Sequence, residues 1–475
     1  MLRSPLLILL YVFAVATAPG RTLHVGPGEI AAGLEIPACD VNLTLTGCID
    51  ASDLDRMAGF ITDITTLDLS GTEIVAYSGP RFGSNMTSAP ESTLPAGILA
   101  GLRVSHLILP ESLTAICDGA LMDSRITDIV IPENVSSIGR STFANCTSLR
   151  SITLPASLTT LPDRMAEGCE ALTTVNIPPG VVTIGSRTFF GCRGLEHIGW
   201  PAPLYEIGEE AFALSGLTSA DLSRCTSLTT IGARAFASCP SLSAASLPED
   251  ATDMGQGVFF ECRSLQSVRL PASTVSIPSL TLKGAENITT IELPTGTVLI
   301  DTLAFAGMTG VHSLTMPSTV TDIADGAFEN WSGLNAIDGS RLTLVPALGE
   351  DVWAGVNQSE VNLTVDRRLE NLFLTTPQWQ DFAIGHTSGI TQTDSGLQQS
   401  VTAGFNGTTL TVTSTVPLAR VELYAVDGRL LTLTDMPDDN VTTIDTSSYT
   451  GPFFIVRATP ADDNPCVTLK LMRLN

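Results

Sequence analysis

Cysteine and histidine are the residues of this 475-residue chain with the widest chemistry, since both serve as nucleophiles, proton carriers and metal ligands. The chain has ten cysteines and five histidines. Half of the cysteines recur 23 or 47 residues apart, at Cys146, Cys169, Cys192, Cys239 and Cys262. The sequence has no Cys-x-x-Cys pair and no histidines at zinc-ligand spacing, so we expect no metal site.

The usual catalytic motifs are missing as well. The sequence contains no Gly-x-Ser-x-Gly, no His-Glu-x-x-His, no phosphate-binding P-loop and no Gly-x-Gly-x-x-Gly. The histidines are scattered singly along the chain, at His24, His106, His197, His312 and His386. We therefore expect a protein that is not an enzyme and that carries no cofactor.

The five recurring cysteines favour buried structural thiols over disulfides. A free cysteine behaves as a small hydrophobic residue, and Ser215 or Met308 stands at the same position in repeats that lack cysteine. Cys39 and Cys48 lie outside this series and close together in the sequence. They are the candidate disulfide of the chain, with two unpaired thiols as the alternative.

An internal repeat of about 23 residues places these cysteines. An aliphatic residue followed by proline recurs at 22 or 23 residue spacing, for example at Leu154-Pro155, and Phe143 begins a second series in the same register. The phenylalanine series continues at Phe189, Phe212, Phe236, Phe259, Phe305 and Phe328, with Ala166 and Leu282 in phase. Series that share one register indicate a solenoid of stacked coils.

Each repeat predicts a short strand followed by a turn and an interior plug. Ile152 and Leu154 are two residues apart, so both point inward from one strand, and Pro155 ends it. An Ile-Gly or Met-Gly pair follows, as at Gly139, where we expect a positive φ. Phe143 then fills the coil interior. Because one coil cannot bury both of its apolar edges, neighbouring coils must stack with parallel strands.

Two of these strings, Thr142-Phe143-Ala-Asn-Cys146-Thr-Ser-Leu149 and Ala235-Phe236-Ala-Ser-Cys239-Pro-Ser-Leu242, resemble the BspA-type leucine-rich repeat of bacterial surface proteins. The resemblance covers residues 94–386, including a closing repeat. Residues 19–93 resemble the N-terminal cap of secreted members. The implied fold is a β-rich leucine-rich-repeat solenoid with parallel strands and coils of about 23 residues.

The N-terminus indicates export. A single arginine and a short apolar run that ends in small residues predict a signal peptide over residues 1–18, with cleavage after Ala16. No later stretch is long enough to span a membrane. The formal net charge of −25 disfavours nucleic acids and anionic lipid surfaces as partners.

The C-terminal residues have a different pattern. Residues 387–400 are a linker rich in Ser, Thr, Gly and Gln, and residues 401–475 alternate apolar and polar positions between turns, which predicts a small antiparallel β-sandwich. The string Leu423-Tyr424-Ala-Val-Asp427-Gly428-Arg429 resembles the sorting domain of type IX secretion cargo. The resemblance implies handling by that export machinery and a place at the surface of, or outside, a Gram-negative cell.

The outward positions of the repeated strands are the candidate binding face. They carry mostly Ser and Thr, and arginine is the one side chain among them that is frequent in binding hot spots. The candidate residues are Asp128, Thr153, Asn176, His197, Asp221, Arg269 and Glu292. The alternative is a solvated wall that binds nothing.

The leading hypothesis is a non-enzymatic secreted or cell-surface protein. The resemblance implies adhesion through protein–protein binding to host matrix or neighbouring cells. The alternative is a structural or scaffold component of the bacterial envelope or biofilm, without a single specific ligand. The fold does not separate these two, because function must be argued from a site.

Overall fold

The computed structural model of the chain describes residues 20–31, 42–60, 64–82, 86–386, 401–406, 408–425, 429–449, 453–461 and 467–472. The chain divides into two compact units, Met1–Ile384 and Gly385–Asn475. The predicted signal peptide, the linker 387–400 and Cys39 lie outside the described residues, so the expectations for them stay predictions.

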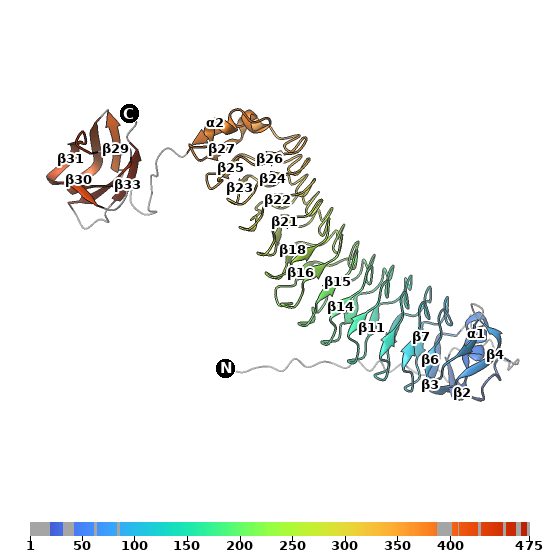
Figure 1. The fold of residues 1–475 in the computed structure, drawn as a ribbon. Coiled ribbons are helices and arrows are strands. Elements are labelled where there is room, and N and C mark those ends of the chain that lie inside the picture. Colours follow the sequence, from blue (N-terminus) through green and yellow to red (C-terminus); the bar gives the residue numbers. More distant parts are fainter. Residues whose placement is uncertain are drawn as a thin grey trace, which may run out of the picture. The chain divides into compact units, whose positions relative to one another are not determined.

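The first unit is a solenoid whose coils stack side by side (Figure 1). Each coil gives at most one short strand to a first row, which is split into sheets of seven, three and four strands. β9, β11 and β13 pair in parallel and in register, as do β16, β18 and β20. The strands of this row are β1 (Arg21–Val25), β2 (Asn42–Ile49), β3 (Thr66–Ile74), β7 (His106–Ile108), β9 (Asp128–Val130), β11 (Ser151–Thr153), β13 (Thr174–Asn176), β16 (Ser219–Asp221), β18 (Ala244–Ser246), β20 (Ser267–Arg269), β23 (Ser313–Thr315), β25 (Ala336–Gly339), β27 (Asn362–Val365) and β28 (Ala383–His386).

A second row of two-residue strands follows on another side of the coils, in sheets of three, five and four strands. Here too the neighbours pair in parallel. The strands are β6 (Thr93–Leu94), β8 (Ala115–Ile116), β10 (Ser137–Ile138), β12 (Thr160–Leu161), β14 (Thr183–Ile184), β15 (Glu206–Ile207), β17 (Thr230–Ile231), β19 (Asp253–Met254), β21 (Ser276–Ile277), β22 (Leu299–Ile300), β24 (Asp322–Ile323) and β26 (Ala347–Leu348). The predicted parallel solenoid is confirmed.

Additional elements close both ends of the solenoid. The N-terminal end carries α1 (Ala51–Phe60) and the hairpin of β4 (Tyr77–Phe82) with β5 (Met86–Ala89). The C-terminal end carries η1 (Gln358–Glu360), α2 (Glu370–Phe373) and η2 (Trp379–Asp381). At this end the Gln378 side chain accepts from the Val352 backbone N–H at 3.0 Å and donates to the Gly349 carbonyl at 2.7 Å. One side-chain amide thus satisfies backbone groups that a further coil would otherwise meet.

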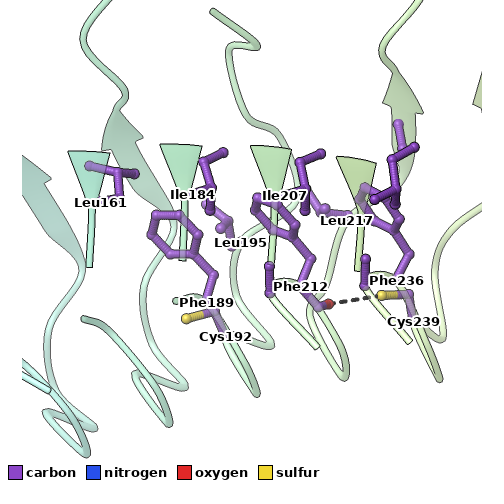
Figure 2. Packing of buried hydrophobic residues seen from close by; sticks show 14 of the residues in the cluster. Leu161, Ile184, Phe189, Cys192, Leu195, Ile207, Phe212, Leu217, Phe236 and Cys239 are labelled. Atoms are coloured by element: carbon purple, nitrogen blue, oxygen red, sulfur yellow. Dashed lines mark hydrogen bonds between the residues drawn. The ribbon is translucent and has the colours of Figure 1, made fainter. Parts of the chain in front are cut away.

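Phenylalanine fills the interior as predicted. Phe189, Phe212 and Phe236 are fully buried and stacked, with ring centroids 5.4 and 5.5 Å apart along the coil axis. Figure 2 shows Phe189, Phe212 and Phe236 in a row from left to right, one on each successive coil, beside inward Ile and Leu side chains. The stacked rings form part of the buried hydrophobic core that runs through the solenoid.

The recurring cysteines form a buried column beside the phenylalanines, and the predicted structural thiols are confirmed. Each thiol donates to a backbone carbonyl of the preceding coil, as Cys239 does to Phe212 at 3.1 Å (Figure 2). The other bonds join Cys146 to Leu121, Cys169 to Phe143, Cys192 to Ala166 and Cys262 to Phe236. In a later coil the Trp331 indole N–H does the same to the Phe305 carbonyl. Cysteine suits this position because it is small, apolar and a weak donor.

The positive φ expected after the Ile-Gly pairs is wrong. Gly139 and its equivalents have no positive φ, whereas Ser141 and Asn145, later in the same coil, do. A Cβ added to Gly232 would lie 2.5 Å from the Glu209 backbone nitrogen of the preceding coil. Glycine is needed there because two backbones approach closely, and not because of its freedom in φ.

The second unit is the predicted small antiparallel β domain. Its strands are β29 (Val401–Asn406), β30 (Thr409–Ala425), β31 (Leu430–Asp445), β32 (Phe453–Pro460) and β33 (Val467–Met472). The register of the long β30 shifts between Thr413 and Leu418. Both halves pair with β31, while the first half also pairs with β29 and the second half with β32. Leu410 from the first half and Leu423 from the second lie in one buried cluster with Phe454.

Candidate functional site

The outward side chains of the first strand row form two parallel lines, which we call the strand face. In β11, Ser151 and Thr153 flank Ile152, which is buried in the core. The register aligns Ser151 with Asp128 and Thr174, and Thr153 with Val130 and Asn176. Neighbouring strands are ~4.8 Å apart, so each line presents one side chain at about that interval.

All seven predicted candidates are exposed, but they do not form one line. Asp128 and His197 occupy the first line. The second line holds Thr153, Asn176, Asp221, Arg269 and Glu292. They are spread over eight successive coils, a distance on the order of 30 Å at the usual strand spacing. Such a set suits contact with an extended surface and not the enclosure of a small molecule.

Two of the candidates are not on strands, which corrects the prediction. The first row has no strand at His197 or at Glu292, where its sheets are interrupted. In the coil of His197, Trp200 takes the place that leucine has in other coils and packs edge-on against Phe212, with centroids 5.2 Å apart. The larger indole needs more room than leucine, which accounts for the first interruption. No described residue explains the second.

Several polar candidates are bonded to the solenoid itself. The Asp128 carboxylate accepts from the Ser151 hydroxyl at 2.7 Å, one coil further along. The Asn176 side chain accepts from the Leu154 backbone N–H at 2.7 Å and donates to the Leu154 carbonyl at 3.2 Å. His197 contacts the Thr218 hydroxyl at 3.3 Å. These groups hold neighbouring coils in register as well as facing solvent.

Asp221 and Arg269 are also bonded to other residues of the solenoid. The Ser223 hydroxyl and backbone N–H donate to the Asp221 carboxylate, which lowers the pKa of that carboxyl. Arg269, the predicted anchor, forms an ion pair with Glu249. Both side chains of this ion pair are exposed, so breaking the pair costs little free energy when a ligand binds.

The exposed apolar residues of the strand face were not among the predicted candidates. Ile108 is 46 % exposed and Val130 is 65 % exposed. β7 pairs with β9 through His106 and Asp128, and Ile108 and Val130 each come two residues after that pair. The two side chains therefore lie next to each other. Their outward positions in the repeat were a signal for this patch, although only polar and charged side chains were counted as candidates.

A second surface feature lies at the corner that follows the second strand row. It is an open groove of about 540 Å³ lined by Arg140, Ser141, Asp163, Arg164, Ser186, Arg187, Glu209 and Glu210. Arg187 bonds Glu167 at 2.7 Å and also pairs with Glu210, while its guanidinium lies 3.7 Å from the centroid of the Phe190 ring. The groove is filled with internal ion pairs that join coils, so we assign it a structural role.

The described residues offer neither a metal site nor a membrane-spanning helix. They contain no cluster of three or more His, Cys, Asp or Glu side chains that could hold a metal ion. Within the same part of the chain, no helix is both long and apolar enough to cross a membrane.

Repeated coils with parallel strands, inward leucines and stacked phenylalanines define a leucine-rich-repeat protein. The model of the BspA type leucine rich repeat region matches residues 93–219 and 229–344, in six copies. These ranges amount to about half of the chain. The chain belongs to this family.

One of the compared solved structures supports the fold, and two others are similar to a lesser degree. A leucine-rich repeat protein from Bacteroides ovatus is 21 % identical, with a TM-score of 0.54 over 77 % of this chain and 91 % of that one. A leucine-rich repeat protein from Eubacterium ventriosum is 16 % identical, with a TM-score of 0.40 over 67 % and 83 %. A leucine rich cell surface protein from Faecalibacterium prausnitzii is 23 % identical, with a TM-score of 0.27 over 47 % and 82 %. None of the curated proteins compared with the chain matches it.

Proposed function

We propose that this chain is a non-enzymatic secreted or cell-surface protein that mediates adhesion by binding proteins of the host matrix or of neighbouring cells through its strand face. The observation that carries the proposal is the exposed pair Ile108 and Val130 beside His106 and Asp128. Apolar area that is lost from water on contact drives protein association, and the polar residues around it can set orientation.

Family membership and the fold support the same proposal. Leucine-rich-repeat solenoids present long regular surfaces, which suit protein partners better than small molecules. The strand face also has few charges, so a protein partner loses little hydration energy when it docks there. Arg269 is the only arginine or lysine among the predicted candidates, and its partner Glu249 is exposed.

A matched pair of surface variants tests the adhesion proposal. Val130→Asp is expected to weaken saturable binding of the full-length protein to matrix proteins or partner cells by at least about tenfold, because a buried carboxylate has no partner in the complex. Val275→Asp is the control, since Val275 is 58 % exposed but precedes β21 in the second strand row. Binding constants from solid-phase titration give the comparison.

Equal binding by wild type and Val130→Asp would contradict the role of this patch, as would an equal loss in the Val275→Asp control. Absence of saturable binding by the wild type would favour a structural or scaffold role in the envelope or biofilm. That alternative has one specific observation in its support: Asp128, Asn176, Asp221 and Arg269 are all bonded within the solenoid.

The second unit is proposed to direct export across the outer membrane of a Gram-negative cell. The sequence of residues 401–475 resembles a type IX sorting domain, and its strands form a separate compact unit with a core of its own. A domain recognised by secretion machinery has to present its surface independently of the cargo. The signal peptide proposed at residues 1–18 would bring the chain into the periplasm first.

Truncation after His386 tests the sorting proposal. We expect the shortened protein to accumulate in the periplasm, because the first unit keeps its own core while the sorting signal is gone. Cell fractionation and surface labelling measure the distribution. Surface display at the wild-type level would show that residues 401–475 are dispensable for sorting.

A further inference from the structure

Two successive coils of the solenoid share a pattern of exposed side chains that runs from basic to acidic across the strand face. Each coil has an arginine before its strand, an apolar residue that faces outward from the strand, and a glutamate after it. The residues are Arg103, Ile108 and Glu111 on the coil of β7, and Arg125, Val130 and Glu133 on the coil of β9. All of these side chains are exposed, and of the coils in the described part of the chain these two alone combine the three features.

The register of the two strands sets these side chains next to one another. His106 in β7 pairs with Asp128 in β9. In both coils the arginine comes three residues before that pair and the glutamate five residues after it. The Arg125 backbone N–H also donates to the Leu102 carbonyl of the preceding coil at 2.8 Å, which continues the alignment before the strands. Because the strands are parallel, both arginines lie at one edge of the strand face and both glutamates at the opposite edge.

The solenoid does not neutralise these charges. Among the described residues, neither the two arginines nor the two glutamates form an ion pair. Glu133 accepts from the Ala156 backbone N–H at 3.2 Å, a contact that leaves its charge in place. Since neighbouring coils are ~4.8 Å apart, like charges lie side by side at each edge. The patch therefore favours a partner that is acidic at one edge, apolar in the middle and basic at the other edge.

The same patch on a second copy of the chain meets that description. We propose that the strand face binds a second copy about a two-fold axis that passes between these two coils. The rotation reverses the direction of the strands, so Arg125 faces Glu111 of the second copy and Arg103 faces Glu133 of the second copy. Each contact occurs twice, as in any interface with two-fold symmetry. The inference rests on the proposed function, since it names the partner of the same surface: adhesion then joins copies of this chain on neighbouring cells.

The same axis brings the two apolar pairs together. In each coil, the residue midway between the arginine and the glutamate lies in the strand, directly before the exposed apolar residue. Apolar area is thus removed from water at the centre of the interface. Asp128 lies beside this centre, and its carboxylate accepts from the Thr127 and Ser151 hydroxyls at 2.9 and 2.7 Å. Its charge therefore keeps hydrogen-bond donors when water leaves.

Sedimentation equilibrium of the full-length protein tests the proposal. We expect a reversible monomer–dimer equilibrium that shifts towards the monomer as salt is added, because the charged contacts lie at the edges of the interface. Arg125→Glu and Glu111→Arg should each raise the dissociation constant of the dimer at least about tenfold, since either change places like charges opposite each other twice. An equimolar mixture of the two variants should recover the dimer, because both of these contacts in the mixed dimer again join opposite charges.

Arg193→Glu is the matched control, because it makes the same change in net charge outside the two coils. Arg193 is exposed and, in the part of the chain that the structure describes, forms no ion pair. This variant should dimerise like the wild type. A wild type that stays monomeric at every concentration, a mixture that does not recover the dimer, or an equal loss in the control would overturn the inference.

The failure of this inference differs from the failure of the proposed function. If the wild type is monomeric while Val130→Asp still weakens binding to matrix proteins, the second copy is not the partner and the adhesion proposal stands. If the dimer forms and follows the charge exchange while matrix proteins show no saturable binding, the inference is supported and the host-matrix part of the adhesion proposal fails.

Discussion

Replacing Phe236 with alanine is expected to lower the free energy of unfolding of the repeat unit by about 3–5 kcal/mol. Phe236 is fully buried and lies between Phe212 and Phe259, with centroids 5.5 and 5.7 Å away, and Trp200 meets its ring edge-on at 6.1 Å. Alanine would remove the ring from the middle of a stack whose neighbours are fixed by their own coils. The cavity could close only if the coils shifted.

Tryptophan fluorescence during urea unfolding measures this effect for the repeat unit alone. All four tryptophans, Trp200, Trp331, Trp353 and Trp379, lie in the first unit, so unfolding of the C-terminal domain gives no signal. Phe236→Leu is the matched control, because Leu282 stands at the same position in another coil. It should cost about 1–1.5 kcal/mol. A loss of less than about 1 kcal/mol in Phe236→Ala would be smaller than the contribution of the buried apolar area alone, and it would contradict the prediction.

Trp379→Ala is expected to have an effect of similar size, about 3–5 kcal/mol, for a different reason. Trp379 is fully buried in η2, where it packs against Trp353 and Phe373 and donates to the Pro346 carbonyl at 3.0 Å. It covers the aromatic end of the last coil. Its loss would bring water to Trp353 and leave the Pro346 carbonyl without its donor, so both hydrophobic and polar terms add to the cost.

The exposed aromatic residue Tyr205 provides the control for the cap variant. Tyr205 is 54 % exposed on the solenoid wall, so Tyr205→Ala should change the free energy of unfolding by no more than about 0.5 kcal/mol. In Trp379→Ala we also expect the remaining fluorescence to shift to longer wavelength as Trp353 becomes hydrated. An unchanged midpoint together with unchanged emission would show that the core does not depend on this cap.

The 23-residue spacing was sufficient to predict the interior of the solenoid. Ile152, Leu154 and Phe143 are buried as expected, because a position that repeats in every coil meets the same environment each time. The cysteine column follows from the same logic. Composition alone does not predict the column, because the prediction depends on the fixed position of each cysteine relative to the phenylalanine of its coil.

Features that depend on contacts between particular coils could not be predicted from spacing. The role of Gly232 rests on its distance from the backbone of the preceding coil, which no local pattern encodes. The absence of a strand at His197 depends on the size of Trp200 inside the same coil. On the strand face, the repeat identified the outward positions, but the partner of Arg269 is Glu249, which lies 20 residues earlier and in the neighbouring coil.

Because each Phe ring, each thiol bond and each strand pair joins adjacent coils, the solenoid is held together by nearest-neighbour contacts. Gain or loss of one whole repeat therefore alters the contacts between coils only at that position, and the other interfaces between coils stay intact. Recombination between similar repeats can therefore change the length of the solenoid in steps of about 4.8 Å while the contacts that stabilise the other coils stay the same.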